Sequence, residues 1–197
     1  ALAPNALRGR LFAVYMAVNF VALALGQWLI LVGDRLGFVP FAMVSVMFSF
    51  ALLPITMTKV DEPAPVQAPK FRLRSRYDAS PLGMAAAVAS GLVTGEFYGM
   101  GTVFGKAAGF SDAGVASFMA AAILGGAIFQ WPVGIFSDRH DRRVVLLWVC
   151  VLGAGVTVLG FVLAHSAVAA LLPLALVFGG LIFSVYRLAL SRGNDGL

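Results

Sequence analysis

A run of charged residues between two long apolar stretches carries the clearest chemical pattern in the sequence. Gly134 is followed after three residues by Asp138-Arg139, and after two more by Arg142-Arg143. An aspartate near the N-terminus of another helix is stabilised by the helix dipole and the unpaired amides. Arginines pair with carboxylates and anionic surfaces. The group can therefore form a charged latch. The alternative for Arg142 and Arg143 is that they only fix membrane orientation.

Glu96 is the one charged residue inside the apolar stretch 81–104. Counted from Pro81 at about 1.5 Å per residue, it lies about 23 Å into a hydrocarbon core of about 30 Å. A carboxyl group at that depth is costly to insert and can bind and release a proton. Glu96 is therefore a candidate for proton coupling or cation binding. The alternative is a carboxyl that hydrogen-bonds to a neighbour or reaches the outer interface.

Enzymatic and metal-binding patterns are absent from the sequence. His140 and His165 fall in different loops, and neither belongs to a His-Glu-x-x-His helix. No Gly-x-Ser-x-Gly elbow occurs. The single cysteine, Cys150, excludes a disulfide framework and a thiolate zinc cluster. We therefore expect no catalytic residue, no metal and no cofactor.

The composition shows which elements must position these groups. Of the 197 residues, 60% are hydrophobic and 12% are charged, whereas a soluble domain has about 25% charged residues. So little charge cannot cover a globular surface, which argues against a soluble enzyme and against disorder. The basic residues occur in short runs between apolar stretches, so a nucleic-acid partner is not expected. Lipid is the solvent that fits.

Charge-free windows divide the chain into about six spans, since a membrane helix needs about 20 mostly apolar residues. No stretch alternates apolar and polar residues as a barrel strand does. The sequence therefore predicts an all-α, multi-pass membrane protein. We expect helices over 11–33, 36–57, 81–104, 113–136, 144–164 and 167–188.

Polar residues inside spans are expensive, and their distribution separates two kinds of helix. The second and fifth spans hold only small polar groups that can bond to their own backbone, namely Ser45, Ser49, Thr56, Cys150 and Thr157. These spans can face lipid. The other spans carry bulkier polar groups, among them Asn19, Gln27, Tyr98 and Gln130. In the third span, small residues repeat every four positions at Gly91, Gly95 and Gly99, which favours close helix packing. The alternative for these glycines is a hinge.

Basic residues predict the orientation. With six spans, twelve of the 14 lysines and arginines lie on the side of the two chain ends, and only Arg35 and Lys106 lie on the other. By the positive-inside rule the basic side is cytoplasmic. We expect a multi-pass protein of the plasma (inner) membrane with both ends of this segment in the cytoplasm and an anionic inner leaflet beside them.

A long connection separates two units of unequal size. Residues 59–80 combine a Pro-rich part with an alternating basic part and read as a cytoplasmic linker. Two spans precede this linker, in residues 1–58, and four follow it, in residues 81–197. The chain also begins with Ala1 rather than Met, and we expect it to be a segment of a longer protein.

The charged pattern resembles the loop signature of the major facilitator superfamily, Gly-x-x-x-Asp-Arg-x-Gly-Arg-Arg. Gly134, Asp138, Arg139, Arg142 and Arg143 match it, whereas Asp141 stands where the family usually has Gly, so this turn is expected to differ. Two further stretches fit the resemblance: Arg8-Gly9-Arg10 resembles the loop before the family's fifth helix, and 186–197 resembles the loop after the tenth helix of YcaD-type bacterial permeases. The resemblance covers the whole chain as helices five to ten.

The resemblance implies a partial transporter bundle. Residues 1–58 would be the last two helices of the N-terminal lobe, and 81–197 the first four helices of the C-terminal lobe. Glu96, Asn19, Gln27, Tyr98 and Gln130 would then lie on helices that can line a central cavity. Pseudo-symmetry further implies that Asp138 approaches the start of the first span, around residues 9–11.

The expected function is transport of a small solute by alternating access, as an ion-coupled secondary transporter, with the missing helices of the same transporter as partners. Proton coupling is the candidate mode, and the substrate is not identifiable from the sequence. One alternative is a six-span scaffold or self-associating half-transporter. A membrane-embedded enzyme is a remote alternative. Helix five lacks the proline of drug-antiporter signatures beside Gly26-Gln27-Trp28, so antiport by that signature is not supported.

Overall fold

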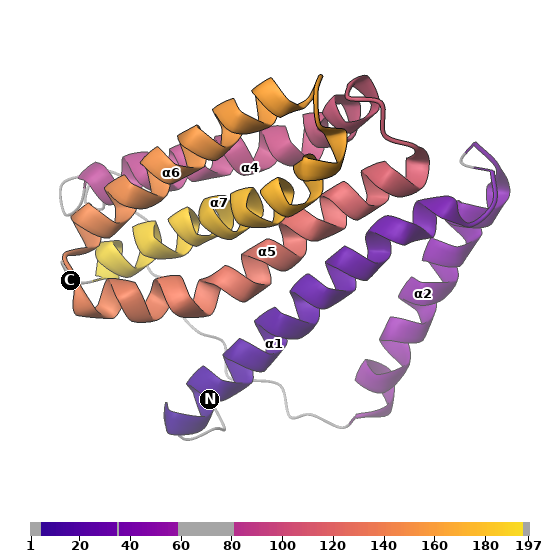
Figure 1. Cartoon of the computed structure of the whole chain (residues 1–197). Helices are drawn as coiled ribbons and strands as arrows, with labels where there is room; N and C mark the ends of the chain where they lie inside the picture. The colour runs from indigo at the N-terminus through magenta and orange to yellow at the C-terminus, as the bar shows by residue number, and fades with distance from the viewer. Residues whose placement is uncertain (1–4, 35, 59–80, 195–197) are drawn as a thin grey trace.

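The computed structural model describes residues 5–34, 36–58 and 81–194, and these residues form helices joined by short turns. Six long α-helices are labelled in Figure 1, and two short 3-10 helices (η1 and η2) extend α1 and precede α7. In chain order the elements are α1 (Asn5–Gly26), η1 (Gln27–Leu31), α2 (Phe38–Met57), α4 (Pro81–Ala107), α5 (Asp112–Arg139), α6 (Arg142–Leu163), η2 (Val168–Ala170) and α7 (Leu171–Asn194).

The helices confirm the all-α prediction, and each predicted span coincides with one long helix. Within the described ranges, four segments are long and apolar enough to cross a membrane: Val14–Leu31, Asp112–Ser137, Arg143–Leu163 and Val168–Val185. In α2 the apolar part is shorter, Phe38–Pro54, and α4, which carries Glu96, is not among the four. The turn expected around His165 is present between α6 and α7.

Polar residues at the helix ends explain why α4 and α5 meet in a tight turn. Ser111 caps α5, its hydroxyl accepting the backbone N–H of Gly114 at 3.2 Å. Gly109 has a φ of +92°, a left-handed conformation that suits glycine after a helix. The Lys106 ammonium, in the last turn of α4, pairs with the Asp112 carboxylate in the first turn of α5. Each charge also opposes the partial charge of its own helix end.

The centre of the bundle lies between α5 and α7, the pair with the most extensive contact, and α4 and α6 also pack against α7 (Figure 1). One cluster joins α4, α5 and α7 through buried residues such as Phe97, Met119 and Leu171. A second joins α6 to α7, with Val145 and Leu181 among its buried members. The residues after the linker therefore form a core of their own.

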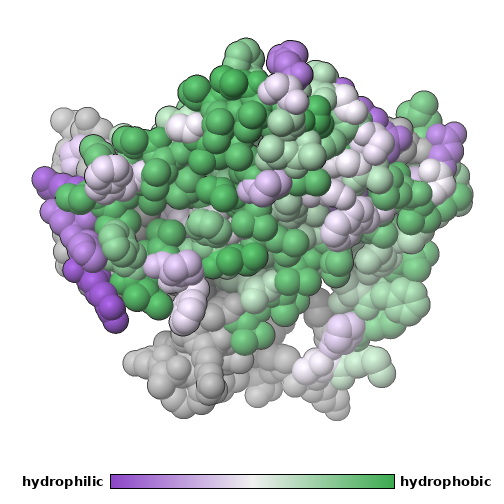
Figure 2. Space-filling view, in the orientation of Figure 1, coloured by the Kyte–Doolittle hydropathy of each residue, from purple (hydrophilic) through white to green (hydrophobic). Residues whose placement is uncertain are grey.

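α2 lies at the edge of the bundle, and nearly all its described side chains are exposed (Figure 1). Its polar residues bond to their own helix: the hydroxyls of Ser49 and Thr56 donate to the carbonyls of Ser45 and Leu53 at 3.0 Å. Thr157 in α6 does the same at 2.9 Å. These three hydroxyls are therefore satisfied within their own helices, and the lipid-facing role of the second and fifth spans stays a prediction. In Figure 2 the visible face is largely hydrophobic, as a lipid-facing surface requires.

Candidate functional site

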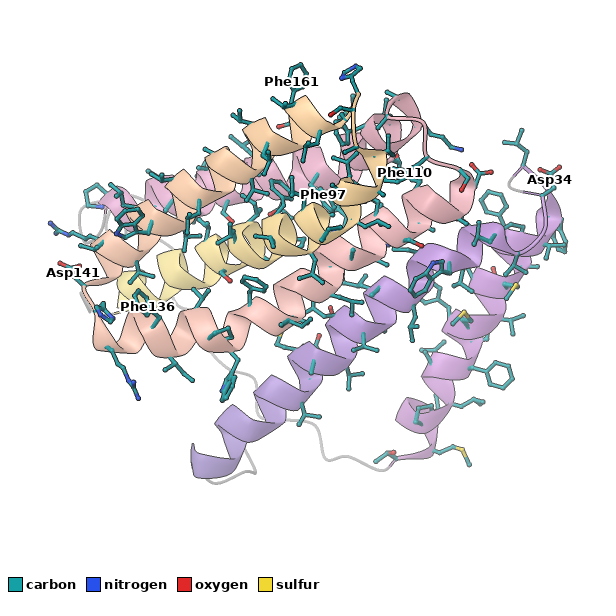
Figure 3. All side chains as sticks on the ribbon, viewed as in Figure 1. Asp34, Phe97, Phe110, Phe136, Asp141 and Phe161 are labelled. Atoms are coloured by element: carbon teal, nitrogen blue, oxygen red, sulfur yellow. The ribbon has the colours of Figure 1, made fainter. Side chains whose placement is uncertain are left out.

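The charged loop and the short α1–α2 turn lie at opposite ends of the helices, as the labelled Asp141 and Asp34 show in Figure 3. We call the end that carries Arg139, Asp141 and Arg143 the basic end, and the end that carries Asp34 and Ser111 the distal end. Helices α1, α4, α5 and α7 run between these two ends (Figure 1).

Asp141 makes the turn at the basic end as short as it is. Helix α5 ends at Arg139, and α6 begins at Arg142, so only His140 and Asp141 connect them. The Asp141 carboxylate accepts the backbone N–H of Arg143 at 2.8 Å and caps α6. The departure from the family's glycine thus has a structural role, since aspartate is a good N-cap residue.

His140 and Phe136 support the same turn from inside the last turn of α5. Their rings stack with centroids 4.2 Å apart, and the His140 Nδ1 lies 3.1 Å from the Phe136 carbonyl oxygen. In Figure 3 the labelled Phe136 lies close to the labelled Asp141. The loop therefore has a fixed shape, which a latch residue needs in order to be presented reproducibly.

The helix dipole affects the arginines of the loop differently. Arg139 ends α5, where a positive charge is favourable to the helix dipole. Arg142 and Arg143 open α6, where the same dipole disfavours a positive charge. Local helix stability therefore does not explain this pair, and both orientation by the membrane and a latch remain open explanations.

The predicted contact of Asp138 with residues 9–11 is not tested, because these side chains lie outside the described ones. The side chain of Arg142 is outside them as well, and Gly134 has nothing within 4 Å of where a Cβ would stand. The ribbons of α1 and α5 approach near the distal end and separate toward the basic end (Figure 1). The latch stays a prediction.

At the distal end α1 and its extension η1 contact α5 through a hydrogen bond from η1 and a small apolar cluster that includes α1. The indole Nε1–H of Trp28 donates to the Ser117 hydroxyl oxygen at 3.3 Å. Beside it, Ala24 packs with Ala120 and Ile123, all three at most 1% exposed. These are the residues that the sequence did not single out as partners: Trp28 reads as an interface anchor, and Ser117 carries no signal of its own.

An aromatic cluster lies where α1, α4 and α7 converge. The Phe183 ring of α7 packs against Phe20 of α1 at 6.0 Å, Tyr98 of α4 at 6.0 Å and Phe97 of α4 at 6.3 Å between centroids. Phe97 is buried, whereas Tyr98 remains 41% exposed. The structure thus brings Tyr98, one of the candidate cavity residues, to the junction between the first helix and the helices after the linker.

The other candidate cavity residues are not brought together. Glu96 and Asn19 are exposed, and no residue in the described part of the chain pairs with either. The Gln27 amide is half-buried and donates to the Leu23 carbonyl of its own helix at 3.3 Å. Gln130 has no described side chain. A shared cavity lined by these residues stays a prediction.

The glycines that make close contacts are not the ones that the four-residue spacing indicates. A Cβ built on Gly91, Gly95 or Gly99 would meet nothing within 4 Å among the described residues, so the close packing expected of this stripe is not formed there. The tight contacts occur between α5 and α7. A Cβ on Gly125 would lie 1.8 Å from the Leu176 carbonyl oxygen, and one on Gly179 would lie 1.9 Å from the Ala122 carbonyl oxygen.

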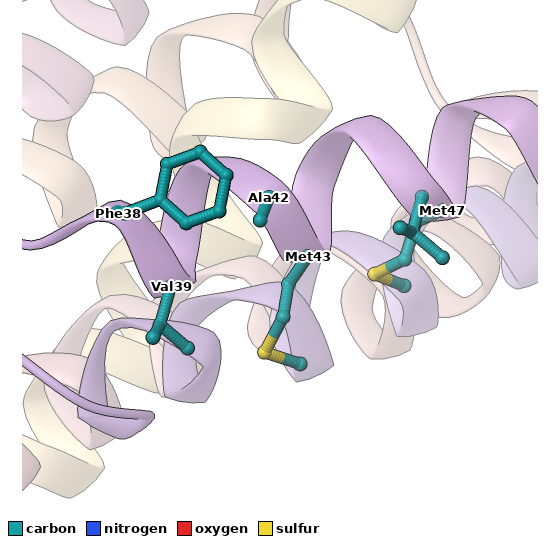
Figure 4. Close-up of a pocket in the computed structure, with 6 residues that line it drawn as sticks. Phe38, Val39, Ala42, Met43 and Met47 are labelled. Carbon is teal, nitrogen blue, oxygen red and sulfur yellow. The ribbon is translucent and has the colours of Figure 1, made fainter.

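A groove of about 340 Å³ runs along α2 and is lined by apolar residues of that helix alone (Figure 4). Phe38, Met43 and Met47 are among them. It offers no convergent polar group to orient a solute. It is a surface feature of the edge helix rather than the candidate site.

Curated relatives agree with this arrangement over nearly the whole chain. An uncharacterised MFS-type transporter of Enterobacter sp. (strain 638) is 32% identical over 195 residues, which is 93% of this chain and 47% of the relative. The uncharacterised MFS-type transporter YcaD of Salmonella arizonae is 30% identical, and that of Salmonella paratyphi B is 29% identical, over the same shares. The resemblance to MFS-type transporters is confirmed, including its YcaD-type branch.

The chain spans about half the length of the curated relatives it matches. No family model matches it, and no solved structure matches it. The apolar helices and these relatives together indicate a multi-pass membrane protein that is similar to MFS-type transporters.

Proposed function

We propose that this chain, similar to MFS-type transporters over 93% of its length, works as the central part of a solute transporter of that kind. That similarity is the observation that carries the proposal. The transported solute is small, the mode is alternating access, and proton coupling supplies the driving force. Residues 1–58 contribute two helices to one lobe, residues 81–197 contribute four to the other, and 59–80 connect them.

The contacts of α1 support a two-lobe mechanism. α1 and η1 contact α5 and α7 through residues toward the distal end, namely Phe20 and Ala24 of α1 and Trp28 of η1. Toward the basic end the ribbons diverge (Figure 1). An arrangement that is closed at one end and open at the other is what alternating access requires of two lobes. The charged loop at the basic end would close the opposite gate when the lobes rock.

The proposal assigns the basic end to the cytoplasm of the plasma (inner) membrane. The lobe helices absent from this chain are its partners, together with an anionic inner leaflet that attracts the linker arginines. Twelve of the 14 basic residues fall on the assigned side, which is the argument for it.

The test is a solute screen on the whole reading frame, expressed in a bacterial host and assayed in membrane vesicles with a pH-sensitive dye. The expected result is uptake or efflux of one solute class that moves protons with it and stops when a protonophore is added. Vesicles that contain folded protein but move none of the solutes, in either direction, would contradict the proposal.

A further inference from the structure

The pentapeptide pattern Gly-Gly-x-Ile-Phe occurs twice in the chain, once in α5 and once in α7. The first copy is 125–129 and the second is 179–183. The two helices run in the same direction, from the distal end to the basic end (Figure 1). Each copy lies in the middle of its helix, and the two copies face each other.

The contacts between the two copies are reciprocal. The carbonyl of Leu176, three residues before Gly179, fills the space over Gly125, and the carbonyl of Ala122, three residues before Gly125, fills the space over Gly179. The hypothetical Cβ to oxygen distances are 1.8 and 1.9 Å. Equivalent positions therefore make equivalent contacts, as in a two-fold axis that runs along the helix pair.

The second glycine and the phenylalanine of each copy extend the same relationship. A Cβ on Gly126 would lie 2.6 Å from the ring of Phe183, and a Cβ on Gly180 would lie 2.4 Å from the ring of Phe129. Each ring thus rests on the glycine of the opposite helix. Small residues allow the two backbones to touch, and the rings block sliding along the helix axes. If α5 and α7 separated, the close-packed contacts between the two helices would also be lost.

The contacts of α1 with this pair are of a different kind. Those that the described residues show are made by side chains: the Phe20 ring on Phe183, the Ala24 methyl beside Ala120, and the hydrogen bond of Trp28 in η1, which extends α1. Replacing such side-chain contacts with contacts to lipid or water costs less free energy than breaking a close crossing of two backbones. Phe183 therefore takes part in both interfaces: its ring packs over Gly126 in the crossing of α5 and α7, and it also contacts Phe20 of α1.

We propose that the two Gly-Gly-x-Ile-Phe segments form a fixed pivot, a reciprocal crossing of α5 and α7 that stays closed while α1 moves against Phe183. This rests on the proposed function, because the movement of α1 is the rocking of one lobe against the other. The pivot makes α5 and α7 one rigid body and leaves the α1 contacts as those that open.

The register of the pivot is tested by paired substitutions in the full chain, with thermal stability in detergent as the readout. Gly126→Ala lowers the unfolding midpoint, and Phe183→Leu in the same chain restores at least half of the loss, whereas Phe129→Leu restores none. Gly180→Ala is restored by Phe129→Leu and not by Phe183→Leu. Equal restoration by either phenylalanine change, or by neither, would overturn the reciprocal register.

The fixed character of the pivot is tested by disulfides in a Cys150→Ala chain held in nanodiscs, with amide hydrogen exchange in α1 as the readout. A Gly126→Cys/Phe183→Cys or a Gly180→Cys/Phe129→Cys disulfide changes exchange in residues 14–26 less than twofold. A Trp28→Cys/Ser117→Cys disulfide slows it at least tenfold, and a reductant reverses this.

The two failures are distinguishable. If the disulfides within the pivot slow amide hydrogen exchange in α1 as much as the Trp28–Ser117 disulfide does, the crossing of α5 and α7 is not fixed. That result would overturn the pivot and would not contradict the movement of α1. A Trp28–Ser117 disulfide without effect would show that α1 does not move, and the movement required by the proposed function would fall with it.

Discussion

Trp28 and Ser117 are 89 positions apart in the chain, and the indole Nε1–H of the first donates to the hydroxyl oxygen of the second at 3.3 Å. The bond joins η1, which extends α1, to the first half of α5, and it lies beside the buried contact of Ala24 with Ala120. The first helix is therefore attached to the helices after the linker at the distal end.

Removal of this bond should open the distal contact. In Ser117→Ala the indole loses an acceptor, and a typical net hydrogen bond contributes about 0.5–1.5 kcal/mol. We expect reaction of an Ala120→Cys thiol with maleimide to become about two- to tenfold faster in a Cys150→Ala chain. Thr157→Val is the control, because that hydroxyl bonds only to Gly153 of its own helix. An unchanged thiol reactivity in Ser117→Ala would contradict the role of the bond.

The crossing of α5 and α7 should tolerate no methyl group. A Cβ on Gly125 or Gly179 would collide with the backbone of the opposite helix, which cannot move aside as a side chain can. Overpacking of this kind costs about 1–3 kcal/mol, so Gly125→Ala and Gly179→Ala should lower the thermal unfolding midpoint of the purified protein.

Gly155 in α6 supplies the matched control for those two glycines. It has nothing within 4 Å of the Cβ position, and alanine is the better helix former by about 1 kcal/mol. Gly155→Ala should therefore leave the midpoint unchanged or raise it. If the Gly125→Ala protein is as stable as the Gly155→Ala protein, α5 and α7 are packed less closely at Gly125 than the structure shows.

The fold was largely predictable from the sequence, because the positions of charges mark helix ends in a chain that lipid must solvate. Pro81 opens α4 as expected, and the turn around His165 divides the longest apolar window. The helix contacts were less predictable. The glycine stripe at Gly91 has the right spacing but meets no neighbour within 4 Å among the described residues, whereas Gly125 and Gly179 pack tightly.

The reason is that spacing along one helix shows which residues share a face, but not which helix lies opposite. A search for internal repeats would have found the paired Gly-Gly-x-Ile-Phe segments. No local signal marks Ser117 as the acceptor of Trp28, since serine in a membrane helix usually bonds to its own backbone. Asp141 could be recognised as a departure from the loop signature, but its role as a cap is visible only in the turn geometry.

Three substitutions of Asp141 should show how much its capping of α6 contributes to stability. Asp141→Ala removes the acceptor for the Arg143 N–H and should destabilise the protein by about 1 kcal/mol. Asp141→Asn keeps a capping oxygen and should cost little, and Asp141→Gly, the family residue, should cost only a few tenths of a kcal/mol. Thermal unfolding of the three variants checks the order. An alanine variant as stable as the asparagine variant would contradict capping.

The proposed orientation predicts opposite results for two reporter fusions. An alkaline phosphatase fused after His165, in the turn between α6 and α7, should be active because that turn is assigned to the outside. A fusion after Gln67, in the linker, should be inactive, and a fluorescent protein there should be fluorescent. A cytoplasmic signal from the His165 fusion would mean that the assignment of the basic end to the cytoplasm is wrong.

Glu96 should reveal whether an intramembrane carboxyl carries the coupling. The side chain is exposed on α4, and no residue in the described part of the chain neutralises it, while a carboxylate at membrane depth costs about 2.5–3.5 kcal/mol unless it is protonated or solvated. Glu96→Gln keeps the shape of the side chain and replaces the carboxyl group with an amide. In the vesicle assay this variant should reduce proton-linked accumulation of the solute at least tenfold and leave movement of the solute down its own gradient unchanged.

Asn19→Ala is the companion variant, expected to change affinity for the solute and not its coupling to protons. Proton-linked accumulation at the wild-type level in a Glu96→Gln protein of normal abundance would remove Glu96 from the coupling mechanism.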